Sequence, residues 1–206
     1  MNSFKQALNH LKSHWQQSLA LGAAASVLLL LTRYLPYIGA FFISLILLIF
    51  QHATEQWLAG KNWKDISFLK KALPAFIIVS VILFPTSVLV GSSMGIIQSS
   101  QGFFVAVPTA WGLLMIAVYF YLVLSHSLRL RFEDNVGIAK AIDIAGMASL
   151  KNFKLYFILS FYLSLLLVLS GFAWNIGLLV ILPLLFFSSH FSFIEMKKMG
   201  LLQVAN

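Results

Sequence analysis

Three histidines and one glutamate are the residues of this chain whose types and spacing could support chemistry. His52, His126 and His190 lie near the ends of long apolar segments, and Glu55 follows His52 by three residues. Imidazole rings bind metal ions and transfer protons near neutral pH. If the fold brings the three histidines to one level of the molecule, they and Glu55 are therefore candidate ligands for a metal ion.

A simpler interpretation is that these are polar side chains at helix ends, within reach of water and lipid head groups. The chain has no cysteine and no closely spaced set of metal ligands. The order His52-x-x-Glu55 is the reverse of the Glu-x-x-His order of di-iron bundles. Neither a Gly-x-Ser-x-Gly elbow nor a phosphate-binding loop nor a His-Glu-x-x-His motif occurs. We favour this interpretation and expect no catalytic residue and no cofactor.

The elements that must position these side chains are long apolar segments. Hydrophobic residues make up 60% of the 206 residues and charged residues 10%, against about 25% charged residues in soluble domains. Residues 72–128 and 155–194 contain no Asp, Glu, Lys or Arg, and each block is roughly twice the ~20 residues that cross a bilayer. The pattern predicts an all-α membrane bundle, a single domain over 1–206, with six transmembrane helices in three hairpins. The predicted spans are 16–34, 37–58, 73–92, 103–128, 153–171 and 174–195.

Basic residues predict the orientation of these spans. Arg33 is the only charged residue on one side, and every other Lys and Arg lies near the N-terminus, in 59–72, in 129–154 or near the C-terminus. Because cytoplasmic loops collect Lys and Arg, both termini are predicted to be cytoplasmic. The residues expected to contact anionic lipid head groups are Lys61, Lys64, Lys70, Lys71, Arg129 and Arg131. Since they lie beside the spans rather than on one compact face, we expect lipid partners and no nucleic acid.

Three of the cytoplasmic segments have the periodicity of amphipathic helices, at about 3–14, 64–72 and 135–149. In the first, the apolar side chains that share a face are Phe4, Ala7, Leu8, Leu11 and Trp15. In the third, they are Ile138, Ala141, Ile142 and Ala145. An apolar stripe opposite charged residues is typical of a helix that lies on a membrane surface. We therefore expect surface helices at these three places.

Three prolines fall inside predicted spans, at Pro85, Pro108 and Pro183. Each removes a backbone hydrogen bond and is expected to kink its helix. In transporters, helices broken in this way surround the binding site. In other membrane proteins, a proline kink only helps neighbouring helices to pack. We favour the packing role.

The first and third predicted hairpins share short sequence features. Ile38-Gly39 opens one returning span and Ile176-Gly177 opens another, and a histidine follows each glycine by thirteen residues. A unit of one surface helix and two spans, used three times, would explain this, as would chance similarity between apolar segments. The residues leave the threefold repeat open.

Some of the same residues carry a family resemblance. The motifs are Pro36-Tyr-Ile-Gly39, the segment 139–152 and the stretch from Gly177 to Pro183. They resemble uncharacterised bacterial inner-membrane proteins, namely the YciC-like family and the membrane domain attached to some glycerophosphodiester phosphodiesterases. The resemblance implies a six-helix protein of the bacterial inner membrane and carries over no catalytic or binding residue.

Three functions are compatible with the sequence. The first is a non-enzymatic integral membrane protein that interacts with lipids, with a protein partner or with further copies of itself. The second is a small transporter or channel for a neutral or apolar solute, with the proline-containing spans around a cavity. The third is a metal-dependent intramembrane enzyme that uses the three histidines and Glu55. We favour the first, because apolar spans and a one-sided basic fringe provide what that role requires.

Overall fold

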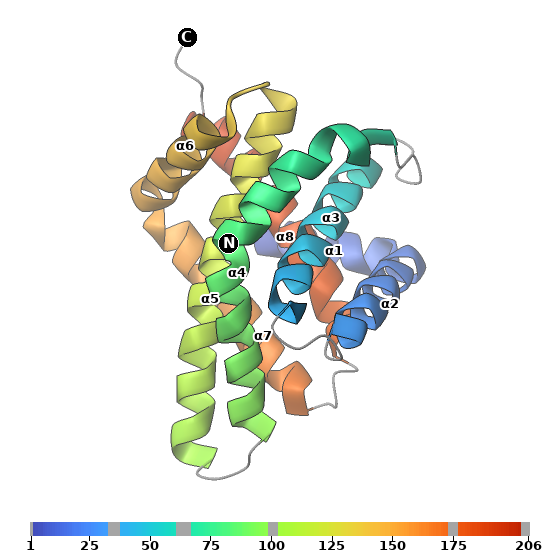
Figure 1. Cartoon of the computed structure of the whole chain (residues 1–206), viewed down its shortest axis with the longest axis vertical. Helices are drawn as coiled ribbons and strands as arrows, with labels where there is room; N and C mark the ends of the chain where they lie inside the picture. The colour runs from blue at the N-terminus through green and yellow to red at the C-terminus, as the bar shows by residue number, and fades with distance from the viewer. Residues whose placement is uncertain (1, 33–37, 61–66, 99–102, 173–176, 203–206) are drawn as a thin grey trace.

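The computed structural model is all-helical (Figure 1). It describes residues 2–32, 38–60, 67–98, 103–172 and 177–202. These residues form eight helices: α1 (Asn2–Ser13), α2 (Trp15–Leu31), α3 (Gly39–Leu58), α4 (Ser67–Gln98), α5 (Phe103–Glu133), α6 (Ile138–Lys151), α7 (Phe153–Phe172) and α8 (Leu178–Lys198). The prediction of a helical bundle is confirmed.

Four of the described helices are long and apolar enough to cross a membrane. They contain the segments Gly39–Leu58, Val107–Glu133, Phe153–Ser170 and Leu178–Lys198. Trp15–Leu31 in α2 has 17 residues, and the apolar part described for α4 is Ala72–Val88. Both are shorter than the ~20 residues of a typical span. The described residues thus contain four candidate spans, as expected of a membrane protein. The first and third of the six predicted spans stay predictions.

Helix α8 forms the centre of the bundle. Residues 181–190 are buried without interruption, and 67% of its apolar segment is buried, against 28% for α3. Helices α1, α2, α3, α5 and α7 all contact it. A helix that is apolar on every side needs neighbouring helices or lipid around it, and for α8 most of that cover comes from neighbouring helices. The outer helices instead expose large apolar side chains, such as Val27, Val81 and Ile116, as expected for surfaces that face lipid.

Helices α1 and α2 run along α8 in the antiparallel direction. The Ser3 hydroxyl donates to the Glu195 carboxylate, and Gly22 of α2 faces the Leu179 carbonyl near the start of α8. A Cβ atom at Gly22 would lie 2.0 Å from that carbonyl oxygen, so only glycine permits this approach. In α1, Ala7 is completely buried and the stripe predicted at 3–14 packs against the core. Its contact with a membrane surface stays a prediction.

Helices α4 and α5 lie side by side, and α6 covers the C-terminal end of α5 (Figure 1). The α6 stripe predicted from the sequence buries Ala141 and Ala145. All three prolines lie within helices. Pro85 and Pro108 are exposed on α4 and α5, whereas Pro183 is buried in α8.

Two hairpins share a local arrangement. Gly39 abuts Thr32 at the end of α2, and Gly177 abuts Ser170 near the end of α7, in both cases seven residues earlier. The Thr32 and Ser170 hydroxyls each donate to the carbonyl three residues before them, at 2.6 and 2.7 Å. Any larger residue at either glycine would collide with the end of the preceding helix. Each glycine thus allows the returning helix to begin close to the helix it follows.

Candidate functional site

His126 joins α5 to α7 and α8 in the core. Its Nε2 lies 3.0 Å from the Ser189 carbonyl oxygen and 3.0 Å from the Ser192 hydroxyl, and its Nδ1 lies 2.5 Å from the Tyr156 hydroxyl. A carbonyl only accepts, so Nε2 carries the proton and Nδ1 accepts from Tyr156. His126 is 1% exposed. Both ring nitrogens are therefore used in holding three helices together.

A second polar network surrounds Gln51 of α3. The Tyr121 hydroxyl of α5 donates to Gln51 Oε1 at 3.0 Å. Gln51 Nε2 donates to the Glu55 carboxylate at 2.9 Å and to the Phe186 carbonyl at 3.3 Å. His52 Nδ1 lies 3.7 Å from the Glu55 carboxylate, and His52 Nε2 lies 3.2 Å from the side-chain nitrogen of Gln56. Gln51 thus links α3 to α5 and α8. Its role has a signal in the sequence, because a glutamine inside an apolar segment needs partners.

Arg129 is at the centre of a third network, at the end of α5. Its Nη1 donates to His190 Nδ1 at 2.9 Å, its Nε donates to Glu133 at 2.6 Å, and its guanidinium lies 4.2 Å from the centre of the Phe193 ring. Lys197 extends the network by ion pairs with Glu133 and with Asp134. The Arg129 guanidinium, expected to face head groups, is therefore bound mainly within the protein.

The three histidines belong to three separate hydrogen-bonded networks. Among the described residues, no group of three His, Asp or Glu side chains is arranged to hold a metal ion. His52, His126 and His190 are also buried, at 6, 1 and 8% exposure, rather than spread over the surface. Of the predicted basic contacts, Arg131 binds the Asn135 side chain and the Val136 carbonyl. Lys61, Lys64 and the side chains of Lys70 and Lys71 lie outside the described residues.

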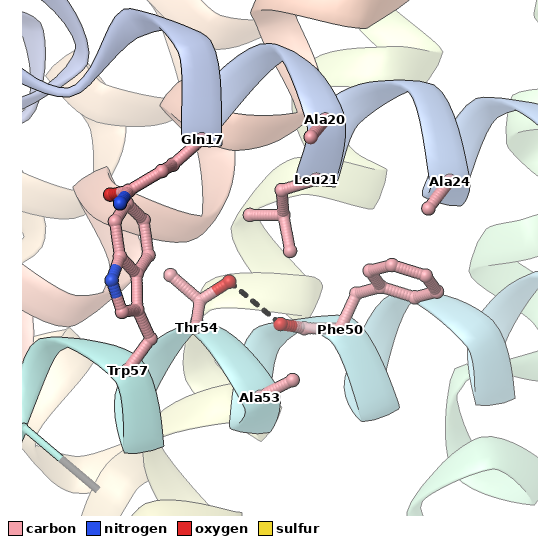
Figure 2. A pocket seen from close by; sticks show the side chains of 8 residues that line it. All are labelled: Gln17, Ala20, Leu21, Ala24, Phe50, Ala53, Thr54 and Trp57. Carbon is pink, nitrogen blue, oxygen red and sulfur yellow. Dashed lines mark hydrogen bonds between the residues drawn. The ribbon is translucent and has the colours of Figure 1, made fainter. Parts of the chain in front are cut away.

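A crevice of about 350 Å³ opens between α2 and α3 (Figure 2). The residues that line it are Gln17, Ala20, Leu21, Ala24, Phe50, Ala53, Thr54 and Trp57. Three of these are alanines, whose small side chains leave space where two helices would otherwise fill it. Gln17, Ala20 and Ala24 are exposed, so the crevice is open at the outside of the bundle. We name it the α2–α3 crevice.

The α2–α3 crevice has a polar end and an apolar end. Gln17 and Trp57 lie together at one end, whereas Ala24 and Phe50 lie toward the other (Figure 2). The Thr54 hydroxyl donates its hydrogen to the Phe50 carbonyl at 2.7 Å. The Thr54 side chain therefore offers the crevice a methyl group and an oxygen that can only accept. The sequence contains a signal for one wall of the crevice, because Ala20 and Ala24 share a helix face with Gln17 one turn earlier. Nothing in the sequence indicates that α3 forms the other wall.

Two histidines adjoin the polar end. The rings of His10 and His14 stack with centres 4.3 Å apart, and their centres lie 5.5 and 6.0 Å from the Trp57 ring. Burial first, and then the neighbouring His14, hold the pKa of His10 below its usual value of 6.5. We name His10 and His14 the histidine pair.

Comparison with protein-family models, curated proteins and solved structures finds no match to this chain.

Proposed function

We propose that this chain is a non-enzymatic lipid-binding protein of a bacterial inner membrane, with six spans and both termini in the cytoplasm. The observation that carries the proposal is the α2–α3 crevice, which is apolar at one end, polar at the other and open to the outside. A membrane lipid has the same division between acyl chain and head group. At about 350 Å³ the crevice is near the lower limit of the roughly 300–1,000 Å³ of ligand pockets, so it would hold part of one lipid.

The polar groups of the core support the non-enzymatic part of the proposal. His126 uses both ring nitrogens in bonds between helices, and His190 accepts from Arg129. Such bonds occupy the ring lone pairs that a metal ion would need. The shared geometry of Thr32 with Gly39 and of Ser170 with Gly177 supports a repeated hairpin.

Photo-crosslinking tests the lipid site. The protein is placed in phosphatidylcholine nanodiscs with a probe lipid that carries a diazirine on its acyl chain, and labelled peptides are identified by mass spectrometry. We expect labelling of the Ala24 and Phe50 peptides well above that of other lipid-facing helices. Ala24→Trp fills the crevice and should abolish the excess.

The matched control is Ile116→Trp, which adds an indole at a residue of α5 that is 45% exposed and does not line the crevice. It should leave the excess labelling of α2 and α3 unchanged. Equal labelling of all exposed helices in the unmodified protein would refute the lipid site.

A further inference from the structure

The α2–α3 crevice ends at a kink that contains a pair of titratable side chains. His14 separates α1 from α2 with φ −124° and ψ 41°, which is not helical. Helical hydrogen bonds still cross the kink, from the His14 amide to His10 and from the Ser18 amide to His14, each at 3.0 Å. The kink therefore holds both imidazoles against Trp57, with His14 three residues before Gln17.

The histidine pair has unused hydrogen-bonding capacity. The His10 Nε2 atom is buried and has no hydrogen-bond partner among the described residues. His14 Nδ1 lies 2.8 Å from the Ser13 hydroxyl, while the His14 ring is exposed. A buried polar nitrogen without a partner costs free energy, which a ligand atom at that place would recover.

The acidic groups of the neighbouring helices are bound elsewhere. In α3, the Glu55 carboxylate accepts from Gln51 and lies beside His52. In α8, the Glu195 carboxylate accepts from the Ser3 hydroxyl. The other charged or titratable groups of α8 also have partners: Lys197 pairs with Glu133, and Arg129 donates to His190. Helix α2 carries no charged residue, and α1 adds the exposed Lys5 and Lys12. The histidine pair thus has no free acidic neighbour on these four helices, and a bound anion would relieve the mutual repulsion of the two rings when both are protonated.

We propose that the α2–α3 crevice selects a lipid with a net acidic head group, and that the protonated histidine pair binds that head group. This inference rests on the proposed function. The acyl chain would lie toward Ala24 and Phe50, with the head group beside Gln17, Trp57 and the pair. Because an anion and the proton each favour the other, selection strengthens as the pH falls through the range in which imidazole titrates.

The test compares two diazirine-acyl probes, phosphatidylglycerol and phosphatidylcholine, at about pH 5.5 and about pH 8. At the lower pH, we expect crevice labelling by phosphatidylglycerol to exceed that by phosphatidylcholine on the order of tenfold, as for one charge-assisted hydrogen bond. Near pH 8 the two should become similar. The double variant H10Q/H14Q keeps polar side chains without the titration and should label equally with both probes at both pH values.

Two controls separate the pair from general surface charge. Lys12→Gln removes a neighbouring exposed cation and should keep the pH-dependent preference, and free glycerol phosphate should not compete with the probe lipid. A preference that Lys12→Gln abolishes, or that glycerol phosphate suppresses, would overturn the inference.

The outcomes distinguish the two proposals. Crevice labelling that is equal for both probes at both pH values would overturn acidic selection and leave the lipid site intact. Absence of crevice labelling by either probe would overturn the lipid site itself. Labelling of H10Q/H14Q by phosphatidylcholine shows whether the variant still folds.

Discussion

At the scale of single residues, a few buried polar side chains of this bundle join helices that are far apart in the sequence. In an apolar environment a hydroxyl or imidazole without a partner is unfavourable, so a buried polar side chain that bonds to another helix favours the arrangement in which the two helices meet. His126 is the clearest case, because its three partners lie on α7 and α8. Gln51 acts in the same way between α3, α5 and α8.

Removal of the Tyr156 hydroxyl tests this role. Tyr156→Phe leaves the His126 Nδ1 atom buried without a donor, and we expect a loss of about 1–2 kcal/mol in unfolding free energy. Tyr162→Phe is the control, because Tyr162 is 39% exposed on the same helix and should change stability little. Thermal unfolding in detergent measures both, and equal melting temperatures for the two variants would contradict a structural role for His126.

At the scale of helices, the tightest contact at a described glycine is that of α2 with α8 at Gly22. Gly22→Ala places a methyl group 2.0 Å from the Leu179 carbonyl oxygen, so α2 must move away. We expect a loss of roughly 1–3 kcal/mol, as for other overpacked positions.

Gly146→Ala is the matched control for that substitution. Gly146 lies inside α6 with open space around the Cβ position, so alanine should stabilise the protein by about 0.5–1 kcal/mol through its higher helix propensity. Opposite shifts of the two melting temperatures are expected. A Gly22→Ala protein as stable as Gly146→Ala would show that α2 does not pack on α8 in this way.

At the scale of the whole molecule, the arrangement of the helix ends is compatible with the charge distribution. The C-terminal ends of α3, α5 and α8 lie at the same end of the molecule as α6, and the C-terminal end of α4 lies at the other (Figure 1). Basic residues flank the first end, so that end is predicted to face the cytoplasm.

Cysteine labelling tests this orientation, since the chain contains no cysteine of its own. A cysteine at Ser99, between α4 and α5, should react with a membrane-impermeant maleimide added to intact cells. One at Ala139, which is exposed on α6, should react only after the cells are opened. The reverse pattern would invert the topology and place the polar end of the crevice on the outer side.

The sequence alone determined the class of this protein and the position of its apolar helices. Hydrophobicity and helical periodicity are local properties, so the apolar segments at 37–58, 153–171 and 174–195 could be assigned without knowing their neighbours. The polar residues could likewise be named from the sequence, but not their partners.

Only the tertiary structure decided which side chains meet. His52, His126 and His190 each lie toward the C-terminal end of an apolar segment. The rotation and packing of α3, α5 and α8 nevertheless direct them into three different networks. The α2–α3 crevice and the stacking of His10 and His14 against Trp57 likewise depend on how α1 and α2 lie beside α3 and α8. Contacts between helices far apart in the chain arise from the fit of whole surfaces, which a local pattern does not encode.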